Sequence, residues 1–86
     1  MKKPLRAEID FETRAGYIYY AAVQGHVTTT LDVWDHGRVA ADLDNTGNVL
    51  AIEVLALDAE TLEHARLFAT ERELEFPAHL EDLIAA

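Results

Sequence analysis

The stretch RVAADLDNTGNVLAIEVL, from Arg38 to Leu55, decides the fold because it has the pattern of two strands joined by a tight turn. Apolar and β-branched residues dominate both arms, at 38–43 and 49–55, and such residues favour strands. Between the arms, DNTGN at 44–48 combines Asp, Asn and Gly, which each favour tight turns. The sequence therefore predicts a β-hairpin whose turn lies at 44–48.

Three further strands are predicted before this hairpin, at residues 5–11, 17–23 and 27–33. Turn residues separate them, among them Gln24-Gly25-His26, and Gly37 is expected to supply a positive φ in the turn after the third strand. Short strands broken by turns at close intervals are typical of consecutive hairpins. We therefore expect a five-stranded antiparallel β-meander over residues 1–57.

Beyond Leu57 the apolar period changes from that of a strand to that of a helix. Leu62, Ala65, Phe68 and Ala69 fall on one helical face, and Asp58 is a favourable N-cap, so a helix is predicted over 58–72. Pro77 can open a short final helix over 77–85. The predicted fold class is α+β, as one domain with a sheet at 1–57 and a helical part at 58–86.

The charge of the chain is strongly acidic and unevenly distributed. The net charge is −9, and residues 42–86 hold eleven acidic side chains against two basic ones, whereas residues 1–41 hold five of each. Direct nucleic-acid binding is disfavoured, because contacts to phosphates need clustered Lys and Arg. A basic protein partner is compatible with this charge.

Several functional classes lose support from composition alone. The chain has no cysteine, no serine and no apolar run long enough to cross a membrane, and the basic start Met1-Lys2-Lys3-Pro4 leads into no signal-peptide-like segment. We expect a cytoplasmic protein without a membrane span. Because no nucleophile lies in a pattern with a base, we also expect no catalytic residues and no cofactor, and thus not an enzyme.

The predicted turn also matches the ligand spacing of a calcium-binding EF-hand loop. Asp42, Asp44 and Thr46 occupy the first ligand positions, Gly47 the turn, and Glu53 the bidentate position. An EF-hand needs a helix on each side, however, and strands are predicted here. Divalent-metal or small-ligand binding by Asp42, Asp44, Thr46 and Glu53 therefore stays an alternative.

The same stretch, Val39 to Thr46, is similar to the first motif of haloacid-dehalogenase-type phosphatases, where an apolar strand delivers an Asp nucleophile and a second Asp. Such enzymes resemble doubly wound α/β domains and use a later lysine. Here the only lysines are Lys2 and Lys3, both before the motif, so this hypothesis is disfavoured.

Both alternating sets of residues in the predicted strands contain large apolar side chains, which differs from a sheet with one solvated face. Two helices can cover one face, so the other face or an exposed strand edge is expected to meet a second copy or a partner. We therefore predict a homo-oligomer, most simply a dimer. The interaction candidates are Trp34, Tyr17, Tyr19 and Ile52.

Taken together, Ile9-Asp10-Phe11-Glu12, the strand Ala15–Tyr19, the turn Val39–Asp44 with Gly47, and the strand Val49–Leu55 resemble one family. The resemblance is to domain of unknown function family 2283, a group of short prokaryotic proteins, and it covers about residues 9–57. Departures are Arg14, Gly16 and Ala51, where the family commonly has an acidic residue, an apolar residue and glycine. The resemblance implies a β-rich fold and no established activity.

These observations favour a small oligomeric protein–protein interaction module. An antitoxin-like or regulatory role toward a basic protein suits the acidic second half, and some relatives in the resembled family look like neighbours of small toxin-like proteins. The function expected from the sequence is therefore binding rather than catalysis.

Overall fold

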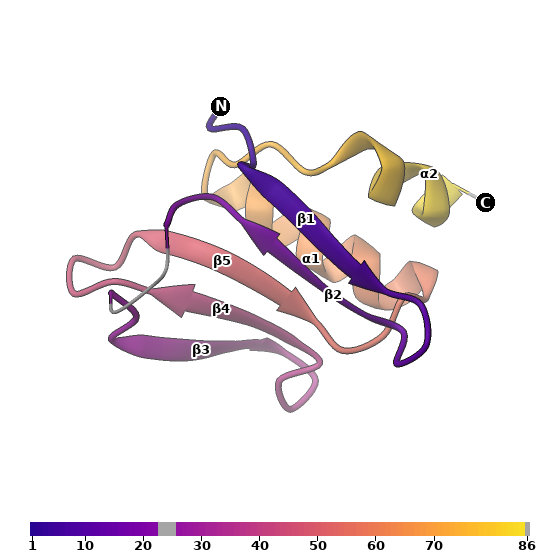
Figure 1. The fold of residues 1–86 in the computed structure, drawn as a ribbon, viewed down its shortest axis with the longest axis horizontal. Helices are drawn as coiled ribbons and strands as arrows, with labels where there is room; N and C mark the ends of the chain where they lie inside the picture. Colours follow the sequence, from indigo (N-terminus) through magenta and orange to yellow (C-terminus); the bar gives the residue numbers. More distant parts are fainter. Residues whose placement is uncertain (23–25, 86) are drawn as a thin grey trace.

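The fold is one antiparallel sheet backed by two helices, and the computed structural model describes residues 1–22 and 26–85 of it (Figure 1). The elements are β1 (Arg6–Asp10), β2 (Ala15–Tyr19), β3 (Thr29–Trp34), β4 (Val39–Leu43), β5 (Val49–Val54), α1 (Ala59–Glu71) and α2 (Ala78–Ala85). The predicted α+β class, with five antiparallel strands followed by a helix and a short helix, is confirmed. The predicted end of the second strand at Val23 and most of the turn at 24–26 lie outside the described residues.

The strand order is β1-β2-β5-β4-β3, which differs from the consecutive order of a meander at one place. β5 lies between β2 and β4, so β2 does not pair with β3, the strand that follows it in the chain. The physical reason is the composition of β5, in which every residue except Glu53 is buried. A central position removes that apolar strand from solvent, while β1 and β3, which carry more charge and hydroxyl groups, take the edges.

α1 lies behind the sheet, and α2 packs against α1 (Figure 1). α1 begins as predicted at Asp58, whose carboxylate accepts a hydrogen bond from the backbone N–H of Thr61 at 2.8 Å. Its buried side chains include the four predicted ones, Leu62, Ala65, Phe68 and Ala69. Among the described residues, no helix combines the length and the apolar character needed to cross a bilayer.

Alternate residues of each strand point to opposite sides of the sheet, and the two sides differ sharply. The side facing the helices carries the core, including Ile18, Val39, Ala41, Ile52 and Val54. We call the other side the open face. By the pairing register it consists of Arg6, Glu8, Asp10, Ala15, Tyr17, Tyr19, Thr30, Asp32, Ala40, Asp42, Ala51 and Glu53.

The open face is less apolar than the sequence pattern indicates. Its large carbon-rich side chains are the two tyrosines, which also carry hydroxyl groups, and its other members are alanine, threonine or charged. A register irregularity between β4 and β5 also interrupts the simple alternation near Val49, which belongs to the core cluster on the helix side. The strands are therefore not equally hydrophobic on both sides.

The helix layer supplies a direct test of where the fold obtains its stability. Leu62 and Leu67 both lie on α1, but Leu62 is 0% exposed and Leu67 is 44% exposed. We expect Leu62→Ala to lower the free energy of unfolding by about 2–5 kcal/mol, because it leaves a cavity in the core. Leu67→Ala should cost about 0.5 kcal/mol or less. Urea denaturation followed by circular dichroism measures both, and equal losses would contradict this packing.

Candidate interaction surface on the open face

The centre of the open face is a pair of stacked tyrosines. Tyr17 and Tyr19 are two residues apart on β2, so both point to the same side, and their ring centroids are 4.9 Å apart with an interplanar angle of 22°. The Arg6 guanidinium on β1 lies 4.4 Å from the Tyr19 ring centroid. The face therefore presents an aromatic surface that already attracts one cation of its own chain.

A hydrogen bond that crosses the central strand fixes the position of Tyr17. Its hydroxyl donates to the Asp42 carboxylate on β4, although β5 lies between β2 and β4. Asp42 also accepts a hydrogen bond from the Thr30 hydroxyl on β3 at 2.9 Å. One carboxylate thus joins side chains from three of the five strands.

The residue beneath this crossing is small. Ala51 on β5 lies opposite Tyr19 on one side and Asp42 on the other. It is 0% exposed although neither α1 nor α2, the helices of the described residues, covers this side of the sheet, which means that neighbouring open-face side chains cover it. Because Tyr17 lies opposite Glu53 on β5, its hydrogen bond to Asp42 runs diagonally past Ala51, and we expect the small alanine side chain to leave room for it.

Negative charge dominates the open face. Five carboxylates, from Glu8, Asp10, Asp32, Asp42 and Glu53, share it with the Arg6 guanidinium, which lies 3.3 Å from a Glu8 oxygen. Burial raises the pKa of the Tyr17 phenol well above its ordinary value, and Asp42 and Glu53 raise it further. Tyr17 is therefore a neutral hydrogen-bond donor at physiological pH.

The four candidate metal ligands fall into two separate places. Asp42 and Glu53 belong to the open face, whereas Asp44 and Thr46 lie in the β4–β5 turn. Strands flank this turn, and an EF-hand would require helices. Among the described residues, no three His, Asp or Glu side chains gather as a group that could hold a metal ion.

Asp44 is occupied by the turn itself. One oxygen of its carboxylate accepts hydrogen bonds from the Thr46 N–H at 2.9 Å, the Thr46 hydroxyl at 2.7 Å and the Asn48 N–H at 3.0 Å. Gly47 takes a positive φ, +85°, as does Gly37, where a positive φ was predicted, at +84°. These hydrogen bonds lower the pKa of Asp44 to about 2, the Thr46 hydroxyl and N–H contributing most. The best motif match in the sequence is thus a turn that uses its carboxylate to bind its own backbone.

The remaining two interaction candidates lie on the helix side of the sheet. The Trp34 ring stacks on the His64 ring of α1, with centroids 4.0 Å apart and planes 12° apart, so it connects β3 to the helix layer. Ile52 is fully buried in the core. Of the predicted interaction residues, only Tyr17 and Tyr19 belong to the open face.

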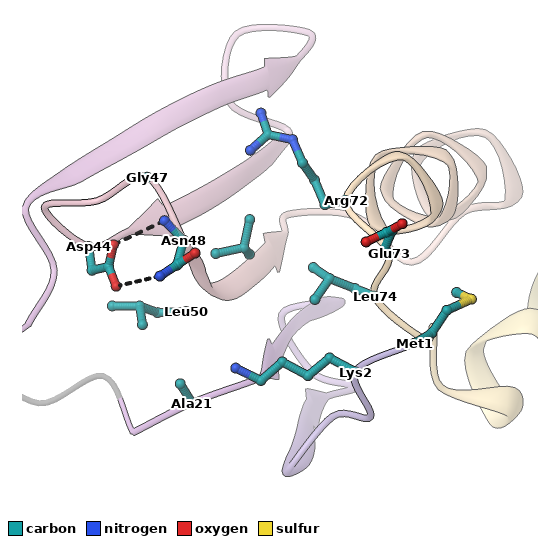
Figure 2. A pocket seen from close by; sticks show the side chains of 11 residues that line it. Met1, Lys2, Ala21, Asp44, Gly47, Asn48, Leu50, Arg72, Glu73 and Leu74 are labelled. Carbon is teal, nitrogen blue, oxygen red and sulfur yellow. Dashed lines mark hydrogen bonds between the residues drawn. The ribbon is translucent and has the colours of Figure 1, made fainter.

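A separate hollow of about 820 Å³ lies at the end of the sheet, between the β4–β5 turn and the segment after α1. Figure 2 shows Lys2 and Arg72 reaching toward it, together with Asp44 and Glu73. The charges of these side chains balance, and the Asp44 carboxylate is directed at Asn48. The hollow therefore shows no preference for a ligand of one charge.

The comparisons with known proteins give no further guidance: no family model, no curated protein and no solved structure matches the chain. The resemblance to family 2283 stays a prediction. The function must therefore be argued from the surface itself.

The sequence missed the contributions of Arg6, Thr30 and Ala51 to this surface. Arg6 and Thr30 contact Tyr19 and Asp42 across hairpins that the sequence predicts, but no sequence signal marked these side-chain contacts. Ala51 lies opposite Tyr19 only because β5 pairs with β2, which the predicted strand order lacks. The period-two pattern assigns each residue to a side of its own strand, but it does not indicate which strands are neighbours.

The Asp44 turn predicts a specific dependence of stability on acid pH. Its folded-state pKa of about 2 lies below the ordinary value of 3.8 for an aspartate, so the ionised carboxylate stabilises the folded state above about pH 4. This contribution is lost as the pH falls from about 4 to 2. In Asp44→Asn, we expect the urea midpoint to fall less over this window than in the wild type. Glu71→Gln, on exposed α1 surface, should follow the wild type; an unchanged Asp44→Asn profile would contradict the assignment.

The hydrogen bond from Tyr17 to Asp42 passes over β5, so we expect two different substitutions to break it. Ala51→Ile fills the space under the Tyr17 ring, and Tyr17→Phe removes its donor, so both should break the hydrogen bond to Asp42. Tyrosine ionisation can be followed by absorbance near 295 nm during an alkaline titration. In each variant, we expect the part of the change that occurs only at the highest pH to lose the contribution of Tyr17. Leu67→Ala, on the exposed surface of α1, is the control and should keep that contribution. A wild-type alkaline titration in Ala51→Ile would show that the size of residue 51 is irrelevant.

Proposed function

We propose that the protein is a small protein–protein interaction module whose open face binds a basic partner. The observation that carries this proposal is the stack of Tyr17 and Tyr19 on the side of the sheet away from α1, set among five carboxylates. Aromatic residues that are held rigid make strong contacts at interfaces with little loss of conformational entropy. Carboxylates beside them select a cationic partner.

Arg6 supports an arginine-containing partner. Its guanidinium lies over Tyr19 and beside Glu8, which is the combination of aromatic and carboxylate contacts that a guanidinium favours. Tyr17 and Glu53, directly opposite each other on β2 and β5, offer the same combination nearby. A partner arginine would meet there an aromatic ring and a carboxylate.

The charge of the open face argues against a second copy as its occupant. Two open faces brought together would place one set of five carboxylates against another, and like charges disfavour association. The predicted homo-oligomer stays a prediction, and the open face is not the surface that favours it. An antitoxin-like or regulatory role toward a basic protein remains compatible with the proposal.

The alternative of divalent-metal or small-ligand binding at residues 42–53 has weaker support. Asp42 accepts hydrogen bonds from two other side chains, and Asp44 holds the turn. A metal ion would have to displace those bonds and draw two separate places together. Protein binding requires no such rearrangement.

A titration of the ¹⁵N-labelled full chain with an oligoarginine peptide tests the proposal. We expect amide shifts to concentrate on the open face and to weaken with added salt, since surface charge pairs are screened. Glu53→Gln should weaken peptide binding by roughly two- to fivefold, as expected for a partly exposed charge pair.

Glu71→Gln, which removes the same charge from α1, is the matched control and should bind like the wild type. Tyr19→Leu should also weaken binding, because it keeps an apolar side chain but removes the aromatic face. If Glu53→Gln and Glu71→Gln weaken binding equally, the peptide responds to net charge and the open face is not a specific site.

A further inference from the structure

β1 is an edge strand of the sheet, so the backbone groups on its outer side have no neighbouring strand among the described residues (Figure 1). The Tyr20 N–H donates to the Leu50 carbonyl at 2.8 Å, and in antiparallel sheets alternate residues bond to each neighbouring strand. Ile18 therefore bonds toward β5, and Tyr17 and Tyr19 bond toward β1. By the register of β1 and β2, the backbone groups of Ala7 and Ile9 point outward, away from the sheet.

From this edge we infer that two copies of the chain pair antiparallel through β1, with Glu8 on the two-fold axis. In this register Leu5 lies opposite Phe11 of the second copy, Arg6 opposite Asp10, and Ala7 opposite Ile9. The outward backbone groups of Ala7 and Ile9 then form the new hydrogen-bonded pairs. The inference concerns the strand edge and does not depend on the proposed role of the open face.

Exposed apolar side chains support this register. Leu5 is 67% exposed and Phe11 is 75% exposed, one at each end of β1. Antiparallel pairing about Glu8 brings each against the other in the second copy, at both ends of the new ladder. A register centred on Ala7 would instead place Phe11 opposite Lys3, and the apolar match would be lost.

The charges are also self-complementary in this register. Arg6 meets Asp10 of the second copy, and Asp10 keeps an oxygen for it, because only its Oδ1 accepts the hydrogen bonds from Glu12 and Thr13. The two Glu8 side chains meet on the axis, but each already has a guanidinium at 3.3 Å in its own chain. Opposite charges therefore surround the one like-charged pair.

The other edge of the sheet is less suited to such pairing. The register of β3 against β4 is interrupted between Asp32 and Trp34, and an irregularity of this kind twists an edge away from a new strand. The register of β1 against β2 is continuous from Arg6 to Asp10. The β1 edge is thus the more regular template.

Single-cysteine variants of the full chain test the pairing and its register, because the wild-type chain has no cysteine. Glu8→Cys would lie opposite its copy in a non-hydrogen-bonded pair, with Cα atoms about 4.5 Å apart, a separation that a disulfide can bridge. We expect it to form a disulfide-linked dimer under mild oxidation at least about tenfold faster than Glu12→Cys, an exposed position in the following turn. Equal rates, or faster cross-linking of Ala7→Cys, would overturn the proposal.

Sedimentation of cysteine-free protein provides the second test. The wild type should show a concentration-dependent dimer, and Ala7→Pro should abolish it while keeping the β1–β2 ladder, because the Ala7 N–H points outward. Phe11→Ala should weaken the dimer by about tenfold, whereas Leu67→Ala, also an exposed apolar side chain, should leave it unchanged. Glu53→Gln should likewise leave the dimer unchanged, although it is expected to weaken peptide binding. The two proposals can therefore fail independently. A wild type that is monomeric at every concentration would overturn the inference.

Discussion

The pairing of β5 with both β2 and β4 is the constraint on which the structure depends. Without it, the β1–β2 hairpin and the β3–β4 hairpin would share no hydrogen-bonded ladder, and an isolated two-stranded hairpin is marginal in water. β5 meets this demand with an apolar composition that favours burial at the centre. Its two sides nevertheless have different tasks: Ile52 and Val54 fill the core, whereas Ala51 and Glu53 belong to the open face.

The small side chain of Ala51 on β5 affects how the open-face side chains are arranged. An alanine in mid-strand contributes little packing of its own, yet here it lets Tyr17 lie over β5 and bond to a carboxylate two strands away. The resulting chain of Tyr17, Asp42 and Thr30 orients polar side chains on the side of the sheet opposite to the core that packs on the helices. Hydrogen bonds between side chains therefore fix the side-chain positions on the open face. On the opposite side, burial against the helices fixes them.

Local patterns in the sequence predicted the elements well, because the turn at 44–48, the cap at Asp58 and the apolar period of α1 are all encoded by neighbouring residues. The strand order could not be predicted in this way, because pairing β2 with β5 joins residues that are 32 to 38 positions apart in the chain. The candidate site was predicted only in part for the same reason. Tyr17 and Tyr19 were found, but Trp34 and Ile52 were assigned to interactions because hydrophobicity alone does not show which side of a sheet a helix will cover.

The fold distributes the acidic residues differently from their order in the sequence. The excess of acid lies in residues 42–86, yet three of the five carboxylates on the open face, Glu8, Asp10 and Asp32, come from the first half. Most acids of the second half instead lie in the helical part, so acidity alone does not distinguish the open face from the helix layer. The tyrosines make that distinction. Arg6 connects this face to the β1 edge, because it lies on β1 with its guanidinium over the Tyr19 ring and beside Glu8.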